Sequence, residues 1–370
     1  MSNARKLADN LPREGQLGNR NIIINGAMAV AQRGTQSTTT NGFGTVDRFR
    51  VFNGSVGTLT TNQHSGTTNA VDGVSNYSFR ATGTNTASLA ANSDAHIRYV
   101  IEDKDIINLG ITNPNNKFTL SFHVKCSVAG QSSVGITTGD FSTARYVVPY
   151  TIAAADTWQK VVITFPGHAS AYSPTSGFGL RLYWDLGIGT NYQTSTYNQW
   201  ITSGSPFAAA GNIQIVGVYD RWLQITGVQL EKGSQSTPFE HEPETVTLAK
   251  CQRYYAKIEG MEAYPCWTYG TVASTQVPLP MQMRTAPSVT FTGTTASNTN
   301  NAVTADNFSV YSASAWKGTN NSGVSYGGTG SSSSQSIRIN IYVYSSFVRD
   351  GVSAGLYIGS NCSINADAEL

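Results

Sequence analysis

Charged side chains are scarce in this sequence: Asp, Glu, Lys and Arg make up 12% of its 370 residues, about half the share usual for soluble domains. The formal net charge is only +2 and no basic block occurs. Binding to nucleic acid is therefore not expected, because it depends on many contacts of Lys and Arg with phosphates. Gly, Ser, Thr and Asn take the place of the charges, while aromatic residues make up 10%. A surface of hydroxyls and amides is typical of extracellular β-proteins, and the composition does not favour disorder.

Cysteines and long apolar runs are also few. The four cysteines lie far apart and form no CxxC pair, so no zinc or other metal site is expected. We expect each thiol to be reduced and buried by itself. The apolar run at 22–24 is far too short to span a membrane, and the polar residues 1–21 do not resemble a signal peptide. The sequence thus predicts no metal, no cofactor and no membrane insertion.

A short amphipathic stripe lies near the N-terminus. Leu7 and Leu11, with two alanines between and before them, have the spacing of one helical face, and Pro12 ends the pattern. A helix this short is marginal by itself. Residues 1–20 are therefore interpreted either as a frayed terminus or as a peg for docking or self-association. In the second case Leu7 and Leu11 are the candidate assembly residues.

From residue 21 to about 242 the pattern is almost wholly that of β-strands. Apolar and polar residues alternate over 118–126 and 178–186, as in strands with one buried face. The segment TWQKVVITFP at 157–166 resembles a strand of carbohydrate-binding jelly rolls. Further strands are expected at 77–81, 97–101, 213–219 and 222–230. Together these strands predict an all-β, two-sheet jelly-roll sandwich over 21–242.

A helix is predicted after the sandwich. Leu248, Cys251 and Tyr255 fall on one helical face, so 243–260 is interpreted as a short helical linker between two domains. Alternating segments then return, which predicts a smaller C-terminal β-domain over 261–370. Its strands are expected at 277–283, 288–292, 308–311 and 337–343.

Four stretches of the chain resemble one family of proteins. The most informative is VQLEKGSQSTPFE at 228–240, and the others are NIIINGAM at 21–28, CQRYY at 251–255 and DAEL at 367–370. They are similar to segments of bacteriophage tail fibres and related virion proteins with a carbohydrate-binding-type jelly-roll module. The resemblance implies a homotrimer in the virion tail that attaches to a host cell-surface glycan.

The same resemblance implies contacts with other virion proteins. Many podovirus tail fibres begin with a long anchor domain, whereas only about twenty residues precede the sandwich here. We therefore expect a short N-terminal peg or a separate adaptor protein to join the chain to the virion tail. A head fibre or capsid decoration protein built of similar modules is the first alternative, and a glycan-cleaving tailspike is the second.

Two groups of aromatic residues are candidates for glycan contact, because aromatic rings stack on sugars while nearby amides bind hydroxyls. One group follows the strand at 178–186. The other flanks the Gly/Ser-rich stretch 318–336, which is expected to form a long loop or tip. An alternative role for both groups is to hold a loop against the sandwich or a neighbouring subunit. The candidates are Tyr192, Tyr197, Trp200, Tyr311, Trp316 and Tyr326.

No catalytic constellation is predicted. Two G-x-S-x-G strings occur, but the last histidine, His241, precedes both serines, which is the wrong order for a hydrolase of that type. The acidic cluster at 102–105 is interpreted as a solvated loop rather than a Ca²⁺ site. Glycoside hydrolysis needs two carboxylates that flank the bond. Five carboxylates on or near the expected strands could contribute to such a pair: Asp140, Asp156, Asp185, Asp220 and Glu231. Nothing in the sequence brings two of them together, so binding without catalysis is expected.

Overall fold

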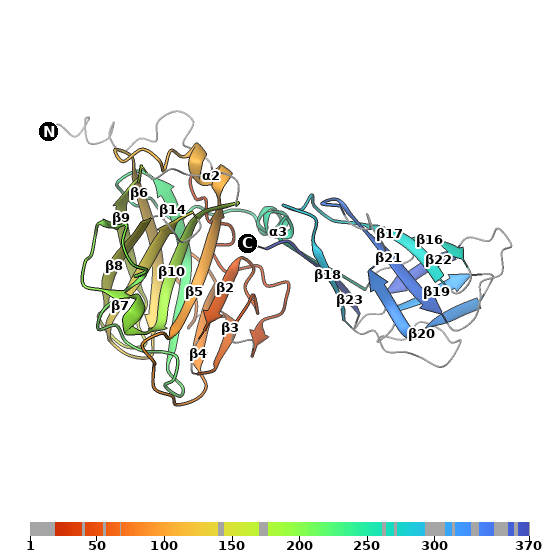
Figure 1. Cartoon of the computed structure of the whole chain (residues 1–370), viewed down its shortest axis with the longest axis horizontal. Helices are drawn as coiled ribbons and strands as arrows, with labels where there is room; N and C mark the ends of the chain where they lie inside the picture. The colour runs from red at the N-terminus through yellow and green to blue at the C-terminus, as the bar shows by residue number, and fades with distance from the viewer. Residues whose placement is uncertain are drawn as a thin grey trace. The chain divides into compact units, whose positions relative to one another are not determined.

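Strands dominate the computed structural model of the chain (Figure 1). Two units are distinguished, residues 1–247 and 248–369. Among the described residues, the only helices are α2, α3 and one 3₁₀ turn, so the predicted all-β class is confirmed. The described residues are 19–38, 41–54, 57–66, 68–139, 144–169, 177–260, 264–269, 272–292, 308–312, 315–326, 333–343, 354–358 and 362–369.

The first unit is a sandwich of two six-stranded sheets whose neighbouring strands are antiparallel. The first sheet has the order β1 (Gln36–Ser37), β3 (Leu59–Ser65), β4 (Tyr77–Gly83), β14 (Trp222–Lys232), β6 (Lys117–Cys126) and β9 (Gln159–Pro166). The second sheet has the order β12 (Trp200–Ile201), β8 (Ala144–Ile152), β7 (Gly130–Thr138), β10 (Phe178–Ile188), β5 (Asp94–Glu102) and β2 (Phe49–Asn53).

Aromatic rings from both sheets meet in the core between them. Phe122 of β6 meets Trp184 of β10 edge to face, with ring centroids 5.7 Å apart. Phe79 of β4 lies 6.4 Å from Phe49 of β2. All four rings are buried, and burying a large side chain of this kind contributes roughly 1.5–3 kcal/mol. The apolar alternation of β6 and β10 therefore faces inward as predicted.

The prediction that β10 exposes its other face was wrong. Arg181 and Tyr183 on that face are also buried, and the segment 189–212 folds over Tyr183 and Asp185. The ring of Phe207 packs on Tyr183 with centroids 5.2 Å apart. Gly135 makes this approach possible, since a Cβ there would lie 2.1 Å from the Phe207 carbonyl oxygen. The segment contains η1 (Thr190–Tyr192), β11 (Gln193–Thr194) and β13 (Ala208–Ala209).

Two shorter segments also differ from the prediction. Residues 213–219 form turns instead of a strand, and two of their backbone N–H groups donate to the carbonyl of Leu186. The cluster 102–105 is not a solvated loop, because it ends β5 and begins the helix α2 (Asp103–Asn108). Asp103 is buried together with Ile106, whose packing into the core holds this helix against the sandwich.

The second unit contains a closed barrel and a small sheet. The barrel has the order β16 (Tyr264–Tyr269), β17 (Val272–Pro278), β21 (Ser336–Val343), β20 (Ala315–Tyr326), β19 (Phe308–Ser312) and β22 (Ala354–Ile358). The sheet has the order β15 (Tyr255–Glu259), β23 (Ser363–Asp367) and β18 (Ser288–Thr292). A separate cluster of buried apolar residues fills this unit.

The expected helical linker is shorter than predicted. The helix α3 covers Glu244–Gln252, and residues 255–259 form β15 instead, because they pair with β23. The expected loop at 318–336 was also partly wrong, since β20 continues to Tyr326 with a register shift between Thr319 and Val324. Closure of the barrel pairs β20 with β19 and β21, and this pairing overrides the low strand propensity of Gly, Ser and Asn.

The segment 21–28, which resembles tail fibres, packs on β14 within the first unit. Asn21 Nδ2 donates to the Val228 carbonyl at 3.1 Å, and the Leu230 N–H donates to Asn21 Oδ1 at 3.1 Å. Gly26 lies so close that a Cβ would be 2.1 Å from the Val228 oxygen. Within the motif at 228–240, a threonine at 237 donates both its N–H and its hydroxyl to Glu231. The strand of this motif, β14, lies between β4 and β6 in the middle of the first sheet.

The other two resembling segments meet in the second unit. Tyr255 pairs with Asp367 in the β15–β23 register, and the Ala368 N–H donates to the Tyr254 carbonyl at 2.7 Å. All four segments thus make structural contacts, which is why they indicate an architecture better than a ligand. Leu7 and Leu11 lie outside the described residues.

The four cysteines are thiols rather than disulfide partners, and Cys126, Cys251 and Cys362 are buried. In the described ranges, no three His, Cys, Asp or Glu residues gather closely enough to hold a metal ion. Of the helices in those ranges, none combines the length and the apolar character needed to cross a membrane.

Candidate functional site

The first group of candidate aromatics packs against the sandwich. Tyr192 stacks on Phe207 with ring centroids 5.3 Å apart. Trp200 meets Tyr146 edge to face at 5.2 Å, and its Nε1 donates to a backbone carbonyl of β9 at 3.0 Å. Tyr197 is partly buried in the same segment. The contacts of Tyr192 and Trp200 match the alternative role, in which the rings hold the loop in place.

The second group lies on the barrel. Tyr311 of β19 pairs with Trp316 of β20 in the strand register, and Tyr326 pairs with Ile339 of β21. These residues thus belong to two neighbouring strands rather than to the borders of one long loop. Their contact with a glycan stays a prediction.

The most suitable surface was missed by the sequence analysis. Trp267 of β16 is 62% exposed, and the guanidinium carbon of Arg338 lies 5.1 Å from its ring centroid. In the strand register Trp267 pairs with Ser274 of β17, and Ser274 pairs with Asn340 of β21. Gln276 pairs with Arg338 in the adjacent row. We call these five residues the Trp267 platform.

Strand alternation produces this platform. Ile337 and Ile339 of β21 are buried in the barrel, so Arg338 and Asn340 between and after them face outward. The same alternation buries Ala273 and directs Ser274 outward on β17. The polar groups of the platform are ordered by their own contacts. The Ser274 hydroxyl donates to Asn340 Oδ1 at 2.6 Å, and Gln276 Nε2 donates to the hydroxyl of Ser336 at 2.8 Å.

The platform combines the groups that bind a sugar. An indole face covers the apolar face of a pyranose ring, while guanidinium, amide and hydroxyl groups bind its hydroxyls. The exposed ring of Trp267 keeps apolar area in contact with water. Removing that area from water favours a complex by roughly 25 cal/mol per Å². The signal in the sequence was weak, because YPCWTY at 264–269 is apolar on both faces of the strand.

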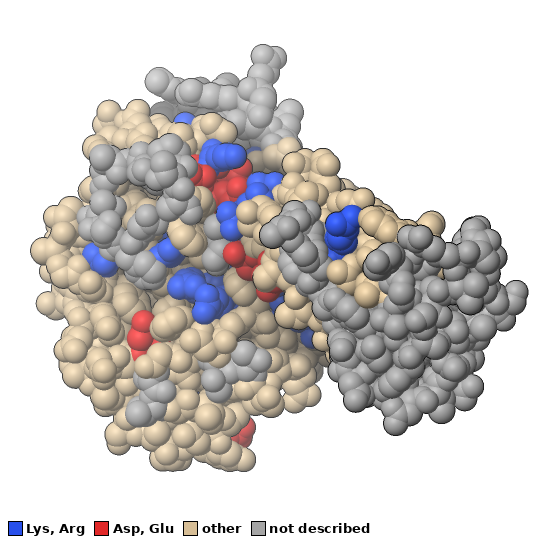
Figure 2. Space-filling model, turned by 45° about the vertical axis from the view of Figure 1, so that its right-hand side comes forward, with Lys and Arg blue, Asp and Glu red and all other residues tan. Residues whose placement is uncertain are grey.

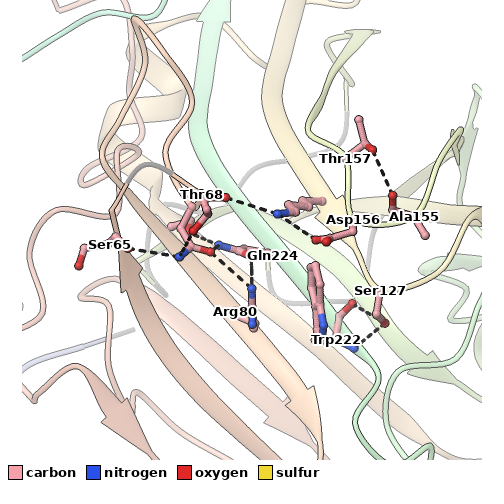
Figure 3. A network of polar contacts seen from close by, with 12 residues as sticks. Ser65, Thr68, Arg80, Ser127, Ala155, Asp156, Thr157, Trp222 and Gln224 are labelled. Carbon is pink, nitrogen blue, oxygen red and sulfur yellow. Dashed lines mark hydrogen bonds and ion pairs between the residues drawn. The ribbon is translucent and has the colours of Figure 1, made fainter.

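A second tryptophan lies in a polar network on the outer face of the first sheet (Figure 3). Its ring is already covered, since the guanidinium carbon of Arg80 lies 4.2 Å from the centroid of Trp222. Arg80 Nη2 donates to Gln224 Oε1 at 2.8 Å, and Gln224 Nε2 donates to Asn69 Oδ1 at 3.2 Å. The network therefore fixes the chain near Asn69 onto the sheet. It leaves less room for a ligand than the Trp267 platform does.

On the face of the molecule drawn in Figure 2, the coloured charged groups lie in small clusters. The face in Figure 2 shows a few groups of Lys, Arg, Asp and Glu on an otherwise uncharged surface. One such group in the network of Figure 3 joins Lys125 Nζ to Asp156 Oδ1 at 2.9 Å. Paired charges of this kind give no broad attraction for a polyanion.

The candidate carboxylates differ in burial and in their partners. Asp156 is exposed and pairs with a lysine, and Asp220 lies in an exposed turn. Glu231 is buried and accepts hydrogen bonds from threonine and glutamine side chains. Asp185 is buried under the segment 189–212, and this burial raises its pKa to about 7. Asp140 lies outside the described residues. Asp156 and Asp220 both act on the charge of Arg80, so these two exposed carboxylates lie near one cation of the first sheet, whereas Asp185 and Glu231 are each held by their own hydrogen-bond donors.

Comparison with known protein families finds no match to this sequence, and comparison with curated proteins finds none either. Solved structures show weak likenesses. An enzymatically active domain of tailspike protein 4 of bacteriophage CBA120 has 12% identity and a TM-score of 0.31, over 58% of this chain and 22% of the tailspike chain. A family 11 carbohydrate-binding module of Clostridium thermocellum has 12% identity and a TM-score of 0.28, over 54% of this chain and 96% of the module. A cyclase from Fischerella sp. TAU has 12% identity and a TM-score of 0.33, over 58% of this chain and 98% of the cyclase. These scores are too low to transfer a ligand or an activity to this chain.

Proposed function

We propose that this chain is a bacteriophage tail fibre protein that binds a host cell-surface glycan and does not cleave it. The observation that carries the proposal is the Trp267 platform, in which an exposed indole lies beside a guanidinium and two amides. The virion location is supported by the four segments that resemble tail fibres. The chain acts as a homotrimer that joins other tail or adaptor proteins, with the glycan site on its second unit.

A glycan fits the platform better than a protein partner does. The buried centre of a protein interface is more apolar than the rest of the surface, whereas the other platform residues beside Trp267 present hydroxyl, amide and guanidinium groups. One stacked ring contributes on the order of 1 kcal/mol, so a single site binds weakly. Three copies in a trimer raise the avidity by a factor of about 100 or more when the glycans are densely displayed.

Catalysis is not part of the proposal. Two carboxylates must flank a glycosidic bond, about 5–9 Å apart. The described carboxylates that the sequence singled out are either buried with their own donors, as are Asp185 and Glu231, or exposed beside the cation of Arg80, as are Asp156 and Asp220. Incubation with host polysaccharide should therefore release no reducing ends. Sustained release that disappears in an Asp→Asn variant would contradict this part of the proposal.

The binding test uses two exposed aromatics in different units. Trp267→Ala removes the platform ring, while Tyr219→Ala removes a ring of the first unit that is 70% exposed. We expect Trp267→Ala to weaken adsorption of labelled protein to host cells and to arrayed glycans by about tenfold or more. Tyr219→Ala should leave both unchanged. Equal adsorption by the Trp267 variant and the unchanged protein would overturn the assignment of the site.

A further inference from the structure

The strands of the barrel carry positive charge and no negative charge. Their only charged residues are Lys317 of β20 and Arg338 of β21, and none of the six strands contains Asp or Glu. Arg338 is exposed. Within the described part of the chain, no carboxylate forms an ion pair with Arg338. A ligand that reaches the Trp267 platform therefore meets a cation that no strand of the barrel neutralises.

The Arg338 side chain extends across the platform toward the indole. Arg338 lies on β21 and Trp267 on β16, and β17 separates these two strands (Figure 1). Neighbouring strands are about 4.8 Å apart, so roughly twice that distance separates the two backbones. The guanidinium carbon nevertheless lies 5.1 Å from the ring centroid of Trp267. With the guanidinium in this place the tryptophan is still 62% exposed, which leaves apolar area for a sugar beside the charge.

The neutral groups of the platform are bonded to one another. The Ser274 hydroxyl donates to Asn340 Oδ1 at 2.6 Å. Gln276 lies directly opposite Arg338 in the strand register, but its Nε2 donates to the Ser336 hydroxyl at 2.8 Å. These contacts order the groups around Arg338 without adding a negative charge. The guanidinium N–H donors thus face neutral side chains and one apolar ring.

We infer that Arg338 makes the Trp267 platform selective for an acidic sugar, whose carboxylate it binds while the indole covers the same sugar ring. The planar guanidinium fork matches a carboxylate in geometry, and charge-assisted hydrogen bonds are stronger than neutral ones. The short separation of the two groups matches a carboxylate carried directly on the stacked ring, as in a uronic acid. The inference rests on the proposed function, because it names the class of glycan that the same site takes.

The size of the preference follows from the exposure of Arg338. Water and salt screen an exposed charge, so such an ion pair contributes only modestly. We therefore expect an acidic sugar to bind about fivefold more tightly than its neutral counterpart. The preference should shrink as salt is added, whereas binding of the neutral sugar should depend little on salt.

The test is a nuclear magnetic resonance titration of two trisaccharides with the full chain. Galacturonate and galactose trisaccharides differ only in the carboxylate or hydroxymethyl group on each ring. The unchanged chain should prefer galacturonate by about fivefold, and Arg338→Gln should bind the two about equally. Lys160→Gln, which removes an exposed cation of β9 in the first unit, is the matched control and should keep the full preference. Thermal unfolding of both variants checks that they are folded.

Further arms separate the possible results. Arg338→Lys keeps the charge and loses the planar fork, so a reduced preference supports recognition of a carboxylate. A sulfated galactose trisaccharide that binds as tightly as galacturonate would overturn the carboxylate assignment. Full preference in a folded Arg338→Gln would overturn the role of Arg338.

Failure of the inference can be told apart from failure of the proposed function. Equal binding of the two trisaccharides by the unchanged chain, lost in Trp267→Ala, would overturn the inference alone. If Trp267→Ala bound both trisaccharides as tightly as the unchanged chain, the glycan site itself would be wrongly placed. Binding of neither trisaccharide by the unchanged chain would count against both.

Discussion

Asn212 donates a hydrogen bond through Nδ2 to Oδ2 of the buried Asp185 carboxylate. The same amide group also donates to the Ser133 hydroxyl at 2.7 Å, and the Gly187 N–H donates to Asp185 Oδ1 at 2.7 Å. Asp185 thus anchors the end of the segment 189–212 to β10. An acidic residue that the strand pattern placed toward solvent became part of a buried polar contact.

This burial predicts a dependence of stability on pH. Asp185 has a pKa of about 7 in the folded chain, raised first of all by desolvation. A raised pKa means that its contribution to stability is complete below the unfolded value, near pH 4, and is lost as the pH rises through about 7. The full effect is on the order of 4 kcal/mol, at about 1.4 kcal/mol per pKa unit. Thermal unfolding of Asp185→Asn should therefore change less between pH 5 and pH 8 than that of the unchanged chain.

The control for this prediction is Asp156→Asn, which neutralises an exposed carboxylate whose side chain is 71% accessible. It should retain the pH dependence of the unchanged chain. Parallel unfolding curves for Asp185→Asn and the unchanged chain over this range would show that Asp185 does not titrate as its burial implies.

Two tryptophans should differ in their effect on stability. Trp200 contacts Tyr146 and donates a hydrogen bond to the backbone of β9, so Trp200→Ala should lower the free energy of unfolding by about 2–4 kcal/mol. Trp267 is exposed, so Trp267→Ala should change it by only about 0.5 kcal/mol. Denaturant titration of both variants checks the difference. A stability loss of the same size in both would contradict the distinction between a structural ring and a binding ring.

Some strands of the first unit could be predicted because apolar and polar residues alternate clearly along them. In β6 the inward residues are apolar and their neighbours polar, and in β9 buried and exposed residues alternate although the exposed Val162 is apolar, so alternation located both strands. The covered outer face of β10 could not be found this way, because Phe207 comes from a loop distant in sequence from Tyr183. The strand β20 was hidden by Gly, Ser and Asn, and only barrel closure explains it. Trp267 was hidden because apolar residues occur on both faces of its strand.

The close approach of Gly26 to β14 gives a third prediction. A Cβ at this position would lie 2.1 Å from the Val228 carbonyl oxygen, and that oxygen belongs to backbone that cannot move alone. Gly26→Ala should therefore destabilise the chain by about 2 kcal/mol or more. Gly34→Ala is the comparison, because nothing lies within 4 Å of a Cβ there and only the positive φ of +112° opposes it. Thermal unfolding should show the smaller loss for Gly34→Ala, and the reverse order would count against the close contact.

Trimer formation and avidity give the last prediction. Attachment through several weak sites requires that the copies act together, since avidity gains a factor of about 100 or more without any new contact. Light scattering of the purified chain at micromolar concentration should give the mass of three copies, and replacing Leu7 and Leu11 with Asp should reduce that mass or prevent joining to the virion.

Trp267→Ala should keep the trimer mass and lose adsorption, because its ring lies on the outer face of β16. In trimers that mix variant and unchanged chains, adsorption should fall much more steeply than the fraction of intact sites. A linear fall would mean that each site acts alone, and a monomer mass for the unchanged chain would remove the physical basis for avidity.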